Sequence, residues 1–237
     1  NADLGLALCL EIAGALREDL ILLAMSATLE TAALADLMAA PVVRAEGRSF
    51  PVDTRWLDQP LGRGARLEAA TADLVAQAVA ETEGGVLVFL PGEGEIRRTA
   101  AALEGRLPAG CVIRPLYGAL PLAAQRAAIR PEREARKVVL STSVAETSLT
   151  IEDIRVVVDA GRARRSRFDP GAGMARLVTE RVTRAEAAQR AGRAGRVAPG
   201  VAYRLWSKGE EGALAAHPPE EIEAADLAGL ALELALW

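Results

Sequence analysis

The sequence KVVLSTSVAETSLTI, residues 137–151, joins a short apolar run to a stretch that is dense in hydroxyl side chains. Residues 137–140 predict a strand buried on both faces of a sheet, because their apolar positions are continuous rather than alternating. Six of the next ten residues carry hydroxyl groups. Such groups, with free backbone N–H groups at a strand end, can bind phosphates of a nucleotide or a nucleic acid. The alternative is a helix cap rich in Ser and Thr. We call residues 141–151 the hydroxyl segment.

The chain on either side of this segment alternates between predicted strands and predicted helices. Regular alternation of this kind predicts an α/β fold, with a parallel sheet and helices on both of its faces. Ligands of such sheets bind at the carboxyl ends of the strands. The predicted strands are 86–90, 111–116, 137–140, 154–158 and 200–206, and the predicted helices are 65–81, 93–107, 121–129 and 184–196.

Two stretches interrupt the regular pattern. Residues 46–60 contain Gly and two Pro without a clear period, so we expect a domain boundary near Gly47. The turn-rich residues 170–173 separate two short extended segments. They predict a β-hairpin over about 167–179 that projects from the sheet.

The two ends of the chain predict parts of further domains. The N-terminal pattern is typical of the end of another α/β sheet, with helices over 2–17 and 29–38 and short strands over 20–25 and 42–43. Residues 220–237 predict an amphipathic C-terminal helix. We therefore expect the chain to be cut from a longer protein.

The charge of the chain is unevenly distributed. The net charge of −4 argues against a protein that coats nucleic acid through bulk charge. Between Arg155 and Arg204, however, twelve arginines stand against four acidic residues. This excess predicts a local basic face on an acidic protein. Apolar residues make up 51% of the sequence and aromatic residues only 3%, so aliphatic side chains and Ala must build a sizeable core.

Several classes of site are not indicated by the sequence. Cys9 and Cys111 show no metal-ligand spacing, and we interpret them as thiols in a reducing cytoplasm, with no metal site. His217 stands beside two prolines without a catalytic partner, which favours a loop histidine. No run of about 18 apolar residues predicts a membrane span. The first residues lack the basic region of a signal peptide.

A second distinctive stretch is QRAGRAGR, residues 189–196, which we call the arginine segment. Its three arginines recur at a spacing of three, so they can share one face of a helix. The interleaved Gly and Ala residues leave that face without bulk, which would let a large anion approach the guanidinium groups. Guanidinium groups suit phosphate oxygens and stay charged at any working pH. The alternative is a solvated arginine-rich helix.

In this order, the two segments resemble motifs V and VI of the DEAH-box helicases of superfamily 2. Ser26-Ala27-Thr28 is similar to motif III, LVFLPGEGEI at 87–96 to motif IV, and LYGALP at 116–121 to a further element of that family. The residues 168–178 and 217–237 resemble the bacterial HrpB type in particular. The resemblance covers nearly the whole chain and implies a RecA-like (P-loop NTPase-type) fold.

The resemblance also implies roles for individual residues of an ATP-dependent RNA helicase. Arg193 and Arg196 correspond to arginine fingers on the ATP phosphates, and Gln189 to a residue near the attacking water. The other implied roles are nucleotide binding for Ile129, Thr150 and Glu152, coupling for Ser26 and Thr28, RNA binding for Thr142 and Ser143, and strand separation for the hairpin with Arg167, Phe168 and Thr179. Where the family has Asn, this chain has Ser143, and where eukaryotic relatives have an aromatic residue it has Ile129.

The resemblance divides the chain into the end of a first RecA-like domain (1–46), a second RecA-like domain (47–207) and the start of a winged-helix region (208–237). The sequence contains neither a GxxxxGKS/T motif nor a DExH motif. We therefore expect this chain alone to be inactive as an ATPase, with the ligands of Mg²⁺ and the partner wall of the ATP site in an upstream domain. The alternatives are a non-catalytic nucleic-acid-binding scaffold and a DNA-directed translocase.

Overall fold

The computed structural model describes residues 2–25, 32–44, 49–132, 134–146, 150–169, 171–219 and 225–236. The contacts between residues divide the chain into two compact units. One consists mainly of residues 1–47, and the other of residues 48–219 with 224–237. The predicted boundary near Gly47 coincides with this division, whereas the assignment of the units to named domains stays a prediction.

A six-stranded sheet forms the centre of the larger unit. All neighbouring strands are parallel, and their order is β1-β8-β5-β2-β4-β3. The apolar strands predicted from the sequence occupy its interior, where β2 is buried along its whole length. The strands are β1 Val52–Leu57, β2 Gly85–Phe89, β3 Cys111–Leu116, β4 Arg136–Ser141, β5 Ile154–Asp159 and β8 Gly200–Ser207. The prediction of a parallel α/β sheet is confirmed.

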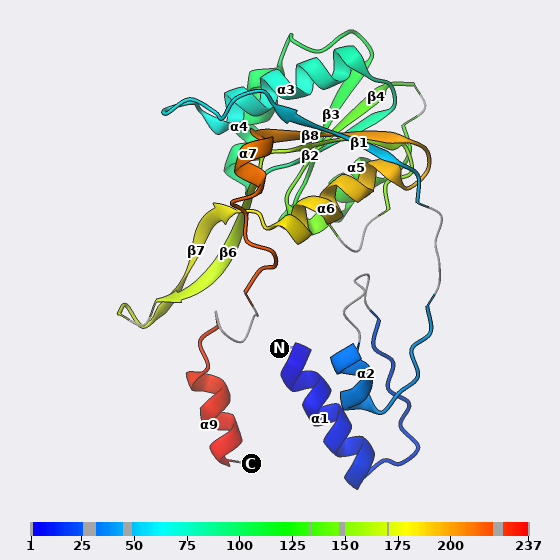
Figure 1. The fold of residues 1–237 in the computed structure, drawn as a ribbon, viewed down its shortest axis with the longest axis vertical. Helices are drawn as coiled ribbons and strands as arrows, with labels where there is room; N and C mark the ends of the chain where they lie inside the picture. The colour runs from blue at the N-terminus through cyan, green and yellow to red at the C-terminus, as the bar shows by residue number, and fades with distance from the viewer. Residues whose placement is uncertain are drawn as a thin grey trace. The chain divides into compact units, whose positions relative to one another are not determined.

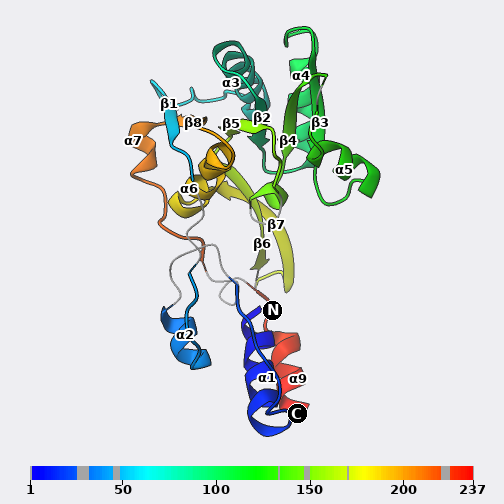
Figure 2. The same cartoon turned by 90° about the vertical axis from the view of Figure 1, so that its right-hand side faces the viewer.

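Helices cover both faces of this sheet, as Figures 1 and 2 show. On one face, α3 (Leu67–Glu81) and α4 (Glu93–Leu103) bury Val75 and Ile96 against β2, β4 and β5. On the other face, α5 (Leu122–Ile129) and α6 (Arg184–Gly192) bury small side chains such as Ala128 and Ala191. The sheet is thus closed on both sides, and polar residues reach solvent mainly at the strand ends.

The strand β1 corrects the expectation that residues 46–60 lack regular structure. Val52, Thr54 and Trp56 are less exposed than Asp53 and Arg55, so the period-2 alternation of a half-buried strand is present in this stretch. The flanking residues Pro51 and Pro60 obscured it. The strand pairs with β8 along the edge of the sheet.

The smaller unit corrects two predicted strands. Its helices are α1 (Ala2–Ala15) and α2 (Ala32–Met38), in agreement with the periodicity. Residues 20–25 and 42–43, however, form no strand, and Ile21 and Val43 are more than nine-tenths exposed. A strand requires a hydrogen-bonded neighbour, and the described residues of this unit provide none.

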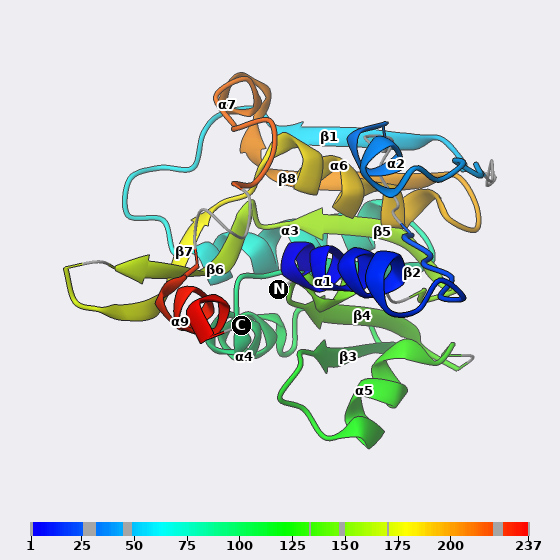
Figure 3. The ribbon, with the colours of Figure 1, turned by 90° about the horizontal axis from the view of Figure 1, so that it is seen from below.

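The predicted β-hairpin is present and longer than expected. It consists of β6 (Arg162–Asp169) and β7 (Met174–Arg181), which pair as an antiparallel two-stranded sheet. The hairpin follows β5 directly, and Figure 3 shows it projecting beyond the carboxyl ends of the parallel strands. The chain continues after β8 through the short helix α7 (Lys208–Glu211), and α9 (Ala228–Leu236) lies within the predicted C-terminal helix.

Candidate functional site

The arginine segment begins on a helix with a well-formed N-terminal cap. Thr183 Oγ1 accepts a hydrogen bond from Glu186 N, and Glu186 Oε2 accepts one from Thr183 N at 2.7 Å. This capping box fixes the start of α6. The helix ends at Gly192, and residues Arg193–Gly195 continue as a single 3₁₀ turn. The predicted helix over 184–196 is therefore too long by about one turn.

Arg190 is the first arginine of the segment, and it lies inside the protein with an exposure of only 1%. Its Nε donates to Glu146 Oε1 at 2.6 Å and its Nη1 to Asp159 Oδ1 at 2.8 Å. The guanidinium carbon also lies 5.0 Å from the centre of the Phe89 ring. Arg190 thus joins the hydroxyl segment, the end of β5 and the end of β2 through one buried cation.

The pKa values in this cluster reflect burial and pairing. Burial opposes the charge of Arg190, but Asp159 and Glu146 outweigh it and raise the pKa of Arg190. Burial raises the pKa of Glu146, an effect that Arg190 offsets in part. The guanidinium is therefore a permanent charge to which the two carboxylates are fixed.

The other two arginines of the segment bind the same part of the chain. Arg193 is 6% exposed and donates from Nη2 to the main-chain oxygen of Glu146. Its burial and the nearby charge of Arg196 lower the pKa of Arg193 to about 10, so it remains a cation at neutral pH. Arg196 is exposed, and its Nη1 donates to Thr150 Oγ1 at 2.5 Å. All three arginines thus face the hydroxyl segment, although only Arg190 lies on the helix α6 and the other two follow its end.

The small residues of the arginine segment have a different role from the predicted one. Ala191 and Ala194 are buried in the core beneath the sheet, and only Gly192 is exposed. A Cβ atom at Gly195 would approach Phe50 O to 2.5 Å and Val52 Cγ2 to 2.8 Å. The interpretation that these residues clear a surface for a ligand is wrong for all but Gly192, because the others let the segment pack against the sheet.

The arginine segment runs from the carboxyl ends of the strands, where Arg190 binds Asp159 at the end of β5, to their amino ends. Phe50 N, two residues before β1, donates to Gly195 O at 2.9 Å, and Gly200 N at the start of β8 donates to Pro51 O at 3.1 Å. The helix α6 starts near the carboxyl edge and carries the segment back across the sheet. The expectation that ligands bind at the carboxyl ends of the strands stays a prediction.

The proposed nucleotide residues lie near this segment. Thr150 and Glu152 are exposed. Ile129 ends α5 and packs against the core cluster that contains Ile151 and Ala194, so its side chain belongs partly to the core. Gln189 is half-buried in the last turn of α6.

The proposed RNA-binding residues lie at the carboxyl edge. Thr142 directly follows β4, and its N donates to Leu116 O at 3.2 Å. Ser143 begins a 3₁₀ turn, Ser143–Ala145, and is exposed. The structure therefore brings Arg196 to the predicted nucleotide residue Thr150 and places Thr142 and Ser143 at the carboxyl ends of the strands. Ser26 and Thr28 lie outside the described residues.

The predicted hairpin residues are partly neutralised. Arg167 donates to both oxygens of Glu180 at 2.9 Å, and Thr179 Oγ1 accepts from Arg164 Nε at 3.4 Å. Phe168 stands opposite Ala175 near the tip and is half-exposed. Ion pairs therefore neutralise part of the predicted basic face, on the side of the hairpin that carries Arg167.

Sequence reasoning missed Glu146, Asp159 and Arg190 as a unit. The position of Glu146 within the hydroxyl segment indicated phosphate binding rather than an ion pair. Asp159 ends an apolar strand, and an acid at that point is a signal for a buried cation elsewhere in the chain. No group of three His, Cys, Asp or Glu side chains is arranged to hold a metal ion among the described residues.

Comparison with known proteins places these features in one family. Residues 70–198 match the family described as the helicase conserved C-terminal domain. The chain belongs to this family. The match contains both the hydroxyl segment and the arginine segment, and every strand of the large sheet except β1 and β8.

Individual helicases agree with this assignment. The chain is 49% identical over 239 aligned positions to the ATP-dependent RNA helicase HrpB of Escherichia coli. This alignment covers all of the present chain and 29% of HrpB. It is 39% identical over 201 positions to the pre-mRNA-splicing factor ATP-dependent RNA helicase prp22 of Schizosaccharomyces pombe, covering 81% of this chain and 17% of the relative. The chain therefore spans less than a third of the length of these relatives.

A crystal structure of the E. coli DEAH/RHA helicase HrpB superposes on the chain with a TM-score of 0.93 at 48% identity, covering all of this chain and 30% of the other. The RecA-like fold predicted from the sequence is confirmed by this likeness. None of the helices that the structure describes is long and apolar enough to cross a membrane.

Proposed function

We propose that this chain contains the second motor domain of an ATP-dependent RNA helicase and supplies arginine fingers to ATP hydrolysis. The observation that carries the proposal is the attachment of all three arginines of the arginine segment to Glu146 and Thr150. A nucleotide held at Thr150 would meet Arg196 at once, because the two side chains are already in contact. Two of the relatives described above carry the activity in their names.

In this proposal the arginines stabilise the charge that develops on the phosphates. Arg196 is exposed and exchanges its contact with Thr150 for a phosphate oxygen, while Arg193 lies behind it. A positioned arginine of this kind contributes roughly 10³–10⁵ in rate. Gln189 orients the attacking water, Glu152 and Thr150 hold the ribose, and Ile129 contacts the base without aromatic stacking.

The chain supplies only one wall of such a site. The sequence lacks a P-loop lysine, and the described residues form no Mg²⁺ site. The phosphate-binding loop and the Mg²⁺ ligands would come from an upstream RecA-like domain of the same protein. We propose that the 237-residue chain does not hydrolyse ATP by itself.

The carboxyl edge of the sheet would hold RNA. Thr142 and Ser143 stand at the end of a buried strand, where hydroxyls and backbone N–H groups are available to phosphates. The hairpin with Arg167, Phe168 and Thr179 projects from the same edge and would stand where the strands separate. Ser26 and Thr28 would couple the state of the nucleotide to the movement of residues 1–46 against 47–207, and 208–237 would begin a winged-helix region.

The test uses the full-length protein with RNA and DNA duplexes that carry matched single-stranded overhangs. ATP hydrolysis stimulated by RNA, together with unwinding of the RNA duplex, is the expected result. Binding of RNA without hydrolysis would favour a non-catalytic scaffold. Preferential unwinding of DNA would favour a DNA-directed translocase. Either of these results would overturn the proposal.

A further inference from the structure

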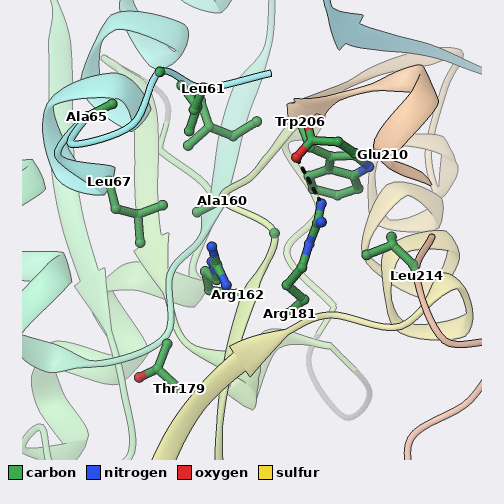
Figure 4. A pocket seen from close by; sticks show the side chains of 13 residues that line it. Leu61, Ala65, Leu67, Ala160, Arg162, Thr179, Arg181, Trp206, Glu210 and Leu214 are labelled. Carbon is green, nitrogen blue, oxygen red and sulfur yellow. Dashed lines mark hydrogen bonds and ion pairs between the residues drawn. The ribbon is translucent and has the colours of Figure 1, made fainter. Parts of the chain in front are cut away.

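A pocket of about 320 Å³ opens at the carboxyl edge of the sheet, at the base of the hairpin (Figure 4). It adjoins the first arginine of the arginine segment, because Arg190 Nη1 donates to the main-chain oxygen of the lining residue Arg162 at 3.2 Å. Leu61 and Leu67 line it from the stretch before and at the start of α3, Arg162 and Arg181 from the two ends of the hairpin, and Trp206 from the end of β8. Its volume is within the range of sites for small ligands, roughly 300–1000 Å³.

One side of the pocket is apolar. The side chains of Leu61, Leu67 and Leu214 surround it in Figure 4, with the Trp206 ring beside Glu210. Gly161 has a φ of 70°, and a Cβ at that position would approach the Trp206 ring to 2.8 Å. Glycine at this point therefore lets the chain turn from β5 into the hairpin directly against the indole.

The other side of the pocket carries positive charge. Arg181 Nη2 lies 3.4 Å from Glu210 Oε1, and Glu210 is held in turn by hydrogen bonds from Ser207 N and Oγ. Those bonds, with the charges of Arg181 and Arg162, lower the pKa of Glu210, so it stays ionised. Arg162 is exposed and, within the described part of the chain, its guanidinium makes no hydrogen bond or ion pair. Two cations and one anion leave the pocket with an excess of one positive charge.

We propose that this pocket binds one nucleotide of single-stranded RNA, with the phosphate on Arg162 and Arg181 and the base against Leu61 and Leu67. Arginine forks suit phosphate oxygens, and an apolar wall suits the flat face of a base of any sequence. The proposal rests on the proposed function, because it assumes that the carboxyl edge holds RNA.

The position of the pocket agrees with a continuous path for one strand. Thr142 follows β4, the pocket follows β5, and only β2 separates these two strands. Neighbouring strands lie about 4.8 Å apart, so the two sites are roughly 10 Å apart along the edge. A single strand gripped at Thr142 would therefore reach the pocket within a few nucleotides.

The test compares Arg162→Ala with Arg176→Ala in the full-length protein. Both residues are hairpin arginines, but Arg176 is 72% exposed, lies 3.7 Å from Asp169 near the tip and does not line the pocket. The contact from Arg162 O to Arg190 is a main-chain one, so Arg162→Ala preserves it. Affinity for a single-stranded RNA is measured by fluorescence anisotropy at several salt concentrations.

Arg162→Ala is expected to weaken RNA binding about fivefold and to reduce the slope of log K against log salt by roughly 0.7, the value for one phosphate contact of a single strand. Arg176→Ala is expected to change the RNA affinity and the salt slope by less than half as much as Arg162→Ala. RNA that contains 4-thiouridine is expected to crosslink to the peptide that contains Leu61 and Leu67, and less so in Arg162→Ala.

Titration with uridine monophosphate distinguishes a nucleotide of the RNA strand from a free one. If the wild type binds RNA normally and Arg162→Ala has the same RNA affinity as Arg176→Ala, the pocket proposal is overturned and the proposed function stands. The same holds if the free nucleotide occupies the pocket and RNA affinity is independent of Arg162. A wild type that binds no RNA would instead refute the proposed function.

Discussion

Replacing Arg190 by Met should destabilise the larger unit strongly. Arg190 is 1% exposed, and its partners Glu146 and Asp159 have side chains that are only 11% and 3% exposed. Met retains most of the aliphatic stem but leaves two carboxylates without their cation. Breaking a buried ion pair by removing one partner costs about 3–5 kcal/mol. This is a large part of the roughly 5–15 kcal/mol that stabilises a whole domain.

The assay is urea unfolding of the 237-residue chain, monitored by tryptophan fluorescence. Trp56 lies in β1 beside β8, and Trp206 lies in β8 itself. A loss of this size corresponds to a fall in Tm of about 6–20 °C for a unit of this length. Arg176→Met is the matched control, because that arginine is largely exposed, and its effect should stay within about 0.5 kcal/mol.

A triple variant separates the ion cluster from simple packing. Combining Arg190→Met with Glu146→Gln and Asp159→Asn removes all three charges, so it should be more stable than Arg190→Met alone. The reasoning is refuted if Arg190→Met costs less than about 1 kcal/mol, or if the triple variant is no more stable than the single one.

Two further predictions concern the same helix. Gly195→Ala should destabilise the chain by about 1–3 kcal/mol in urea unfolding, since its Cβ would meet the backbone of Phe50. A Cβ at Gly192 has open space, so Gly192→Ala should raise the free energy of unfolding by up to about 1 kcal/mol. Equal effects of the two variants would contradict this. Burial raises the pKa of Glu186, but bonds from Thr183 and Arg165 outweigh it and lower the pKa overall. Its stabilisation is thus present above the ordinary carboxyl range and lost as the pH falls through the lowered pKa. Glu186→Gln should cost about 1–2 kcal/mol at pH 7 and flatten the loss of stability below about pH 5, and an unchanged acid profile would count against it.

The buried strands and the hairpin were predictable because their signals are local. Continuous runs such as 86–90 and the turn residues 170–173 determine strand and turn without knowledge of the rest of the chain. Strand β1 was missed because its alternation is short and bounded by prolines. The strands predicted over 20–25 and 42–43 failed because pairing depends on a neighbour, which local sequence does not reveal.

The site was predictable only in part, for a related reason. The spacing of Arg190, Arg193 and Arg196 predicts a shared direction, and the structure directs all three to the hydroxyl segment. The difference between a buried structural cation and an exposed one depends on Glu146 and Asp159, which lie 44 and 31 residues away in sequence. No local pattern contains that information, so Arg190 was grouped with its neighbours.

The most direct test of the account is the effect of Arg196→Ala on the full-length protein, measured as kcat for RNA-stimulated ATP hydrolysis and as RNA affinity. Arg196 is exposed and makes its described contact with Thr150 alone, so the variant should fold normally. The account predicts a fall in kcat of about 10³-fold or more with RNA affinity nearly unchanged. An equal loss of both, or an unchanged kcat, would contradict the assignment of Arg196 to the ATP phosphates.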